Sequence, residues 1–196
     1  MISIGFFLNL VNQTKSNMKF LKVLLGIIVV LVIVIIIGGL FLPKNYSVSR
    51  STTVNAPDSV VFKNIADFNQ FYKWNPWAKM EPTAKTTFSG TPAQPGHVYA
   101  WTGKETGAGE MKILKVEPNK LVDIDLFFKE PFESHADTKF EIQPDGSGNK
   151  VTWTMSGDQN LISKWMCVFM GGMDKMIGKD FENGLASLKE KSEKGS

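Results

Sequence analysis

A long apolar run near the N-terminus sets this chain apart from an ordinary soluble protein. Val23–Leu42 contains twenty consecutive residues without a charge. A bilayer core about 30 Å thick is crossed by roughly 20 apolar residues, because a helix rises about 1.5 Å per residue. The run is apolar on every face of such a helix, unlike a helix that buries one side in a soluble core. The sequence therefore predicts a transmembrane helix over residues 23–42, behind an N-terminal extension over residues 1–22.

A cleaved signal peptide is the main alternative for this segment. The apolar region of a signal peptide usually covers about 7–15 residues and ends at a small-x-small cleavage site. Here the run is longer, and it ends in Gly38–Pro43, whose sequence GGLFLP is a poor cleavage site. The sequence favours an uncleaved anchor.

Flanking basic residues indicate how the anchor is oriented. Lys15, Lys19 and Lys22 precede the apolar run closely, whereas Lys44 and Arg50 follow it. Basic residues concentrate on the cytoplasmic side of a membrane helix. We therefore expect a single-pass protein of the cell membrane, with its N-terminus in the cytoplasm and the following domain outside.

Residues 44–192 have the composition of one globular domain. All nineteen acidic residues and nineteen of the twenty-two basic residues follow Pro43, so this part is formally neutral. Nucleic-acid binding needs clustered Lys and Arg, which argues against a nucleic-acid partner. One cysteine, Cys167, and two histidines do not form a ligand set typical of zinc. We expect neither a metal nor a cofactor, and the sequence does not indicate an oligomeric state.

Alternation of apolar and polar residues predicts seven strands. An opening strand over Tyr46–Val54 is followed by a helix from Pro57 to about Phe68, and Asn75-Pro76-Trp77 ends this helical region. The later strands are joined by turns too short for helical crossovers, which predicts an antiparallel meander. The six further strands cover Thr86–Ser89, His97–Thr102, Glu110–Val116, Leu121–Phe128, Ser134–Ile142 and Val151–Met155.

After Gly157 the apolar period changes from two residues to about 3.6, which predicts one long amphipathic helix. Four glycines weaken this helix, as is tolerated where a helix bends or where something packs closely. The predicted fold class is α+β, with a curved seven-stranded antiparallel sheet wrapped around a long C-terminal helix and one transmembrane helix before it. The apolar positions of the final helix are Met166, Met170, Met173, Ile177, Phe181, Leu185 and Leu188.

Several stretches resemble a known superfamily. Val54–Phe62, with the sequence VNAPDSVVF, Ile65–Phe68 and Trp74–Trp77 are similar to the opening of SRPBCC proteins, which have the helix-grip fold. The Lys150–Met155 strand and the terminal helix are similar too, so the resemblance covers about Tyr46–Lys191. This superfamily includes START-like lipid-binding domains, pollen-allergen-like proteins and bacterial proteins labelled polyketide cyclase/dehydrase.

The resemblance implies a deep apolar cavity between the sheet and the long helix, able to hold a lipid, a sterol-like or a polyketide-like molecule. Aromatic and Met side chains suit such a pocket, because aromatics supply contact area and Met supplies flexibility. A solidly packed core is the alternative for the same residues. The expected ligand-binding wall consists of Trp77, Tyr99, Trp101, Phe140, Trp153, Met155, Met166, Phe169, Met170 and Met173.

No catalytic residue can be assigned from the sequence. His97 is in register with Tyr99 and Trp101, so it could act as an acid or base inside the cavity. The preceding Pro95-Gly96 favours the alternative of a solvent-exposed histidine at the mouth of its strand. Glu110 is expected on the polar face of the sheet, since its neighbours alternate with apolar residues.

Three functions remain open at this point. The first is membrane-tethered binding of a hydrophobic small molecule. The second is a cyclase- or dehydratase-type enzyme that acts on such a ligand in the same cavity. The third is an interaction partner whose interior is filled by its own side chains. We favour binding over catalysis, because binding needs no catalytic group.

Overall fold

The computed structural model describes the backbone of residues 4–194, with side chains from residue 20 onward. Two compact units divide at Pro43, one over residues 1–43 and one over residues 44–196. Of the expected N-terminal extension, residues 1–3 lie outside the described part of the chain.

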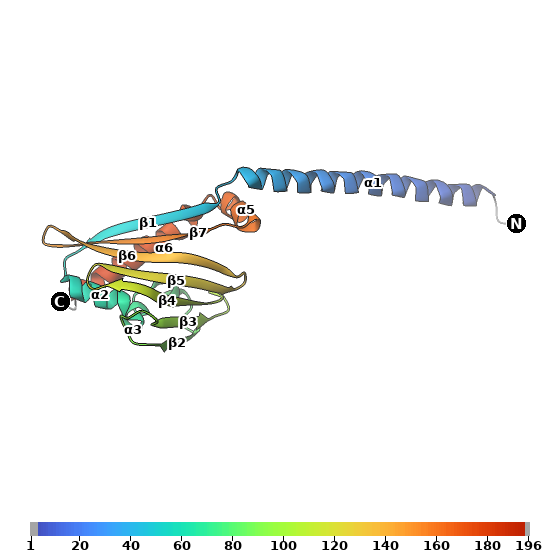
Figure 1. Cartoon of the computed structure of the whole chain (residues 1–196). Helices are drawn as coiled ribbons and strands as arrows, with labels where there is room; N and C mark the ends of the chain where they lie inside the picture. The colour runs from blue at the N-terminus through green and yellow to red at the C-terminus, as the bar shows by residue number, and fades with distance from the viewer. Residues whose placement is uncertain (1–3, 195–196) are drawn as a thin grey trace. The chain divides into compact units, whose positions relative to one another are not determined.

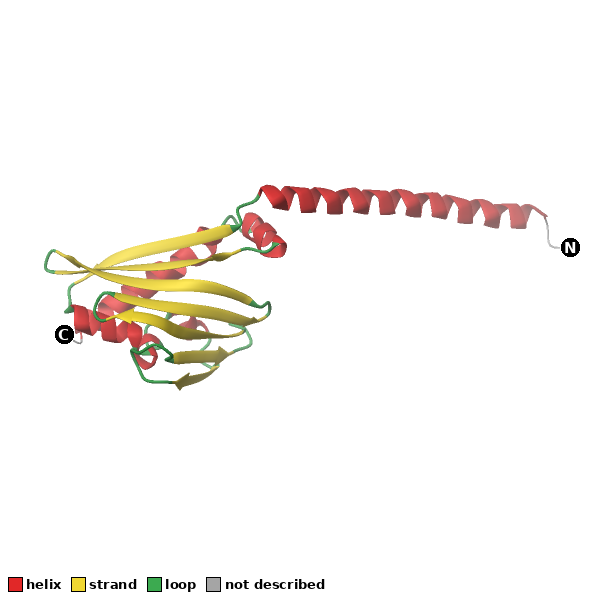
Figure 2. Cartoon of the chain, in the orientation of Figure 1, coloured by secondary structure: helices red, strands yellow, loops and turns green. Residues whose placement is uncertain are grey.

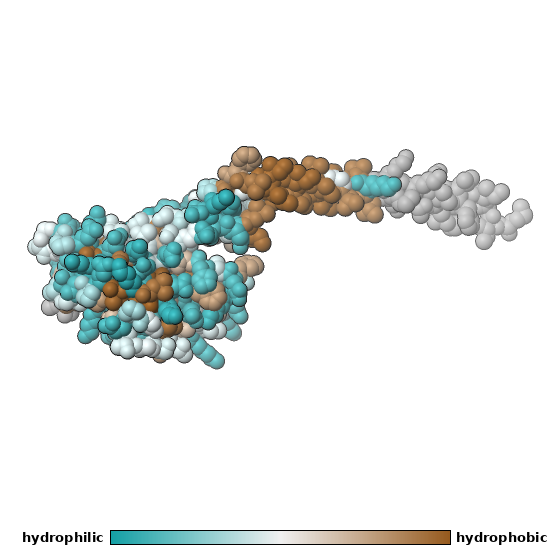
Figure 3. All heavy atoms as spheres, in the orientation of Figure 1, coloured by the Kyte–Doolittle hydropathy of each residue, from teal (hydrophilic) through white to brown (hydrophobic). Residues whose placement is uncertain are grey.

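The first unit is a single helix, α1, over Ile4–Phe41. No proline occurs before Pro43, so nothing interrupts the helical hydrogen bonding of this segment. The helix therefore begins well before Val23, where the sequence pattern placed its start. Its stretch Phe20–Phe41 is long and apolar enough to cross a membrane, and Figure 3 shows an almost continuous apolar surface there. A signal sequence near an N-terminus passes the same test of length and composition.

The second unit contains one seven-stranded antiparallel sheet with the order β1-β7-β6-β5-β4-β3-β2, seen side by side in Figures 1 and 2. The meander from β2 to β7 confirms the topology expected from the short turns. β1 then pairs with β7, in a ladder that begins with Asn45 opposite Asp158 and ends with Val54 opposite Asn149. The strands are β1 Asn45–Val54, β2 Lys85–Ser89, β3 Val98–Thr102, β4 Ala108–Glu117, β5 Leu121–Glu130, β6 Ser134–Asp145 and β7 Gly148–Asp158.

Period-two alternation gives the sheet one apolar face. Along β5, Val122, Ile124 and Leu126 are buried while the residues between them are half-buried, and β6 and β7 repeat this pattern. Successive side chains of a strand point to opposite faces, so the buried residues all point toward the helices. The alternation of apolar and polar residues that predicts these strands in the sequence therefore corresponds to one buried face.

Three short helices follow β1: α2 Asp58–Ala66, α3 Phe68–Phe71 and α4 Pro76–Met80. The Asp67 carboxylate accepts a hydrogen bond from the Asn69 amide and caps α3, and Asn75 caps α4 in the same way through the Trp77 amide. The sequence prediction that Asn75-Pro76-Trp77 ends the helical region is therefore wrong. Asn at the cap and Pro in the first turn are a helix start signal.

The C-terminal region forms two helices, α5 Leu161–Phe169 and α6 Met173–Lys194, instead of the single helix expected. Gly171 and Gly172 separate them with φ values of +83° and +103°. Only glycine adopts such angles readily, and an α-helix cannot continue through them. The break lets α6 run along the sheet behind β1, β7 and β6 in Figure 1.

The core lies between α6 and the inner face of the sheet. The Phe181 ring stacks on the Trp153 indole with centroids 4.1 Å apart, and Phe140 stacks on the opposite side at 4.8 Å. A side-chain carbon on Gly184 would come within 2.8 Å of Trp153 Cζ3, so a glycine is required at this crossing. Trp74, buried on α6's side of the sheet, donates its indole N–H to the Asn64 carbonyl at 2.8 Å.

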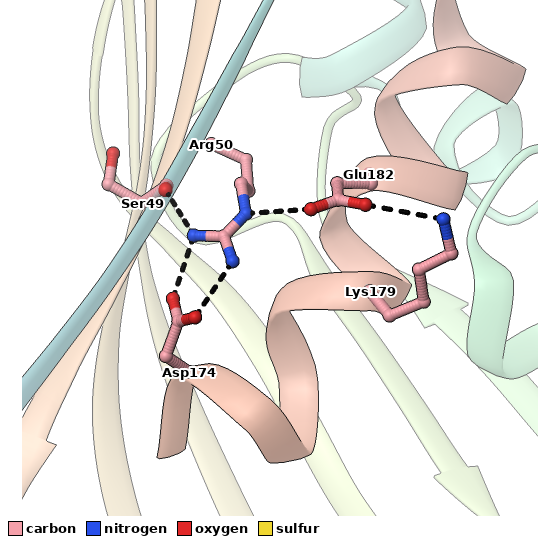
Figure 4. Close-up of polar contacts among 5 residues, drawn as sticks. All are labelled: Ser49, Arg50, Asp174, Lys179 and Glu182. Carbon is pink, nitrogen blue, oxygen red and sulfur yellow. Dashed lines mark hydrogen bonds and ion pairs between the residues drawn. The ribbon is translucent and has the colours of Figure 1, made fainter. Parts of the chain in front are cut away.

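Arg50, the only arginine of the chain, ties the start of α6 to β1. Its guanidinium donates two hydrogen bonds to Asp174, at 2.7 and 3.0 Å, and one to Glu182 at 3.1 Å (Figure 4). These ion pairs lower the pKa of both carboxyls and raise that of Arg50. Gly178 leaves the space that the guanidinium occupies, since a side-chain carbon there would clash with it.

Candidate functional site

A cavity of about 360 Å³ lies between the sheet, α4 and the first turns of α6. Every strand contributes at least one lining side chain, as does the loop between β3 and β4. Its volume falls within the range of small-molecule pockets. The residues that line it are Tyr46, Tyr72, Asn75, Trp77, Ala78, Met80, Glu81, Ala84, Thr86, Tyr99, Trp101, Glu105, Thr106, Met111, Leu126, Phe128, Thr138, Trp153, Met155, Met173 and Ile177.

Exposure distinguishes the mouth of this cavity from its floor. Met80, at the end of α4, is 53% exposed, and Glu105 in the β3–β4 loop is also exposed. Thr138 and Trp153, on the central strands, are each 1% exposed. The cavity therefore opens near α4 and the β3–β4 loop and reaches down to the middle of the sheet.

Six of the ten residues expected to form the ligand-binding wall line the cavity. Four of these six are aromatic, with Trp77 edge-on to Trp153 at 5.7 Å and Tyr99 beside Trp101 at 5.6 Å. Burial raises the pKa of Tyr99 to about 12, so its hydroxyl stays protonated at neutral pH. The six residues are Trp77, Tyr99, Trp101, Trp153, Met155 and Met173.

The other four residues of the expected wall lie outside the cavity lining. Phe140 points inward as expected, but Phe71 and Trp74 cover its ring, with centroids 6.2 and 6.1 Å away. The remaining three belong to the region of α5, which the glycine break separates from α6 and from the core. They are exposed instead of buried: Met166 by 45%, Phe169 by 83% and Met170 by 53%.

Two polar atoms at the cavity floor have no hydrogen-bond partner. They are the Thr138 hydroxyl and the Trp153 indole N–H. In the described part of the chain, only one other buried side-chain atom, Gln159 Oε1, is left in this state. Buried polar groups in native proteins are nearly always paired with protein or water, so this pair marks a place where a partner is missing.

Glu81 fastens the β3–β4 loop to the end of α4. Its carboxylate accepts hydrogen bonds from the backbone amides of Lys104, Glu105 and Thr106 at 2.7, 3.0 and 2.9 Å, and from the Thr106 hydroxyl at 2.8 Å. These bonds favour the charged form and lower the pKa of Glu81 to about 2. Gly103 begins this loop, where any larger residue would clash with the carboxylate.

Replacing Glu81 with Gln should loosen the loop at the cavity mouth. Both carboxylate oxygens of Glu81 accept hydrogen bonds from this loop, whereas the amide nitrogen of Gln can only donate. We expect faster hydrogen exchange at the amides of residues 104–106, measured by mass spectrometry of the full chain, and no change in the matched variant Glu105→Gln. Equal exchange in both variants would contradict this role.

The Glu81 contribution to stability should also depend on pH in a defined window. Its pKa is lower in the folded state than the ordinary value of 4.5. The stabilisation is therefore complete above about pH 4.5 and is lost as pH falls toward 2. The difference in melting temperature between the native chain and Glu81→Gln should shrink across that interval.

The histidine considered as an acid or base is a structural residue. His97 is 1% exposed and does not line the cavity, so the expectation of a solvent-exposed histidine is wrong as well. Its Nε2 accepts a hydrogen bond from the Phe68 amide at 3.1 Å, and Nδ1 lies 2.8 Å from the Ser89 carbonyl oxygen. This pairing fits the neutral ring with its proton on Nδ1.

Glu110 lies on the outer face of the sheet, as expected, and His135 and Asp125 lie on the same face. Glu110 forms an ion pair with Lys129 at 2.6 Å, and exposed His135 contacts Asp125 at 3.0 Å. Among residues 20–194, no three His, Cys, Asp or Glu side chains are grouped as they would be to hold a metal ion.

The sequence pattern did not single out Glu81, Thr138, Tyr72 or Ile177 as site residues, although all four line the cavity. Thr138 had an available signal, because it is a polar residue in register with the apolar positions of β6. Glu81 had none, since its partners are backbone amides more than twenty residues further along the chain.

Solved structures share this fold at low sequence identity. A protein from Thermobifida fusca is 19% identical, with a TM-score of 0.56, and the match covers 76% of this chain and 93% of that one. The solution structure of the Aha1 dimer from Colwellia psychrerythraea is 18% identical, with a TM-score of 0.55, and the match covers 77% of this chain and 98% of that one. An uncharacterized protein from Rhizobium leguminosarum is 15% identical, with a TM-score of 0.57, and the match covers 77% of this chain and 96% of that one. These likenesses show the helix-grip fold alone, and no curated protein matches the sequence.

The sequence itself carries a wider relationship. Residues 46–193, which are nearly all of the second unit, match the family described as polyketide cyclase / dehydrase and lipid transport. The seven-stranded sheet, the long C-terminal helix and the apolar cavity agree with the SRPBCC resemblance found in the sequence. This chain belongs to the polyketide cyclase / dehydrase and lipid transport family.

Proposed function

We propose that this protein binds a hydrophobic small molecule in the cavity between its sheet and α6, while its N-terminal helix holds it at a membrane. The observation that carries the proposal is the cavity itself. It remains open although the surrounding core is tightly packed, and its lining is mainly aromatic and Met side chains. Protein interiors rarely leave a space of this size without a use for it.

The enzymatic alternative has less support from the residues present. Neither His97 nor Glu110, the two groups considered for proton transfer, lines the cavity. Glu81 does line it, but all of its bonds hold a loop, and its pKa of about 2 is far below the range useful to a general acid or base at neutral pH.

Tethering to the membrane is supported by α1 and by α5. Phe20–Phe41 has the length and hydropathy of a membrane span, and the lysines before it favour an N-terminus in the cytoplasm. In the second unit, the Lys44 carbonyl accepts a hydrogen bond from the Gln159 amide at 2.7 Å, so α5 begins close to the first residue after the anchor. The α5 region also exposes large apolar side chains, a property of membrane-facing surfaces. They are Leu161, Ile162, Met166, Val168, Phe169 and Met170.

Native mass spectrometry of the full chain, extracted from the membrane fraction in mild detergent, tests both parts of the proposal. We expect the uncleaved mass of 21.8 kDa together with an additional noncovalent apolar species. A shortened chain in the soluble fraction would contradict the anchor. Protease added outside intact cells should remove the second unit if that unit lies outside.

A cavity-filling variant provides the control for ligand occupancy. Ala84 lines the cavity, and Ala84→Phe should place a ring in the space and reduce the bound species at least tenfold. Ala100→Phe makes the same change on β3 away from the cavity, because Ala100 lies between the inward residues Tyr99 and Trp101. Equal occupancy in both variants would contradict binding in this cavity.

A further inference from the structure

We infer that the cavity selects a neutral, largely apolar molecule that carries a carbonyl oxygen, as in a ketone, ester or lactone, at the end bound against Thr138 and Trp153. This inference rests on the proposed function, since it assumes that the cavity holds an apolar ligand. It adds the chemical class of that ligand and the position of its polar group.

The first argument is the location of the two unpartnered polar atoms. Thr138 pairs with Met155 across β6 and β7, and Phe140 pairs with Trp153, so Thr138 and Trp153 are diagonal neighbours on the inner face. Both line the cavity, and both are 1% exposed. Two neighbouring residues of the cavity floor therefore each carry an unused hydrogen-bonding group, in a space whose lining is mostly apolar.

The second argument is the direction of the Trp153 indole. Phe140 and Phe181 cover its two faces, and its Cζ3 edge lies against Gly184 of α6. Cζ3 is the ring atom farthest from Nε1, so the N–H group points away from α6. The ring is fixed on three sides, and its donor cannot turn to find a partner in the core.

The chemistry of these groups determines what the ligand must supply. An indole N–H is only a donor, whereas a hydroxyl can donate or accept. The partner of Trp153 must therefore be an acceptor, and a carbonyl oxygen has a second lone pair available for the Thr138 hydroxyl. A hydrocarbon would leave both groups unpaired, and burial without a partner is unfavourable for each.

Charge around the cavity excludes an anionic end. No Lys, Arg or His is among the residues that line the cavity, while Glu81 and Glu105 both do. A buried carboxylate or phosphate would have no positive partner and would lie in the same space as two acidic side chains. A neutral carbonyl satisfies the donors at the floor without this cost.

Three naphthalene probes of similar size test the inference on the full chain in detergent micelles. They are 2-acetonaphthone with a neutral carbonyl, 2-ethylnaphthalene with none, and 2-naphthoate with a negative charge. We expect the ketone to bind about tenfold more tightly than the hydrocarbon, which corresponds to one or two buried hydrogen bonds. The naphthoate should bind most weakly. Of the three probes, only the ketone should shift the proton resonance of the Trp153 indole N–H downfield in a ¹H–¹⁵N correlation spectrum.

Conservative variants connect this preference to the two residues. Thr138→Val keeps the shape of the side chain and Trp153→Phe keeps an aromatic ring between Phe140 and Phe181. Each should reduce the ratio of ketone affinity to 2-ethylnaphthalene affinity about three- to tenfold, because a change in cavity volume acts on both probes whereas the lost hydrogen bond acts on the ketone alone. Thr152→Val, on the outer face of β7, is the matched control and should change neither affinity.

The outcomes separate this inference from the proposed function. If ketone and hydrocarbon bind equally, or if Thr138→Val retains the full preference, the inference is wrong and water satisfies the two groups, although the cavity still binds apolar molecules. Tightest binding of 2-naphthoate would also overturn it. If no probe binds and Ala84→Phe has no effect on a co-purified species, the proposed function itself fails.

Discussion

Phe181→Ala should lower the free energy of unfolding by about 3–5 kcal/mol, the usual cost of removing a fully buried aromatic ring. Phe181 is 0% exposed, lies flat against Trp153 and meets Trp77 edge-on at 6.1 Å. Its loss would leave a void where α6 packs against Trp153 of β7. Urea denaturation of the full chain, monitored by tryptophan fluorescence, measures the change.

Phe132→Ala is the control for this effect. Phe132 lies in the turn between β5 and β6 and is 63% exposed, so its removal should change stability by no more than about 0.5 kcal/mol. A loss below about 1 kcal/mol for Phe181→Ala would mean that α6 is not held by this stacking.

His97→Ala should destabilise the protein by about 2–4 kcal/mol. The imidazole is the hydrogen-bond partner of both the Phe68 amide and the Ser89 carbonyl, and its ring stacks on Phe68 at 4.8 Å. Removing it leaves the buried Phe68 amide unpaired, at a cost of about 1–3 kcal/mol, and creates a small cavity. The melting temperature of the full chain is the measurement.

His135→Ala makes the same change at an exposed site. The His135 side chain is 63% exposed and contacts only Asp125 and Phe127 among the described residues, so its loss should cost at most about 1 kcal/mol. His97→Ala should also leave ligand occupancy per folded molecule unchanged, because His97 does not line the cavity. Loss of binding by folded His97→Ala would contradict a purely structural role.

Residue alternation predicted all seven strands, because the central strands alternate between buried inward residues and more exposed outward residues. The break in the final helix could not be predicted from periodicity. The apolar spacing continues from Met166 through Met170 to Met173, and it does not show that Gly171 and Gly172 adopt positive φ. The three residues of the expected wall in the α5 region were therefore misplaced.

The cavity lining was predictable only in part for a related reason. A period-two pattern shows that Phe140 and Trp153 point inward, but not which of them is covered by other side chains. Phe140 meets Phe71 of α3 and Trp74 of the turn after it, and nothing in the local sequence connects these residues to β6. The roles of His97 and Glu81 were harder still to predict, since they depend on backbone atoms of other segments.

The pairing of β1 with β7 affects how this protein can fold during its synthesis. Thr52 lies opposite Val151, and Arg50 finds its carboxylate partners on α6, more than 120 residues later. At about 5–20 residues per second, the first strand waits for several seconds or longer until the ribosome has made its neighbour. Throughout that delay its backbone edge is unpaired, which leaves this strand open to pairing with other chains until β7 has been made.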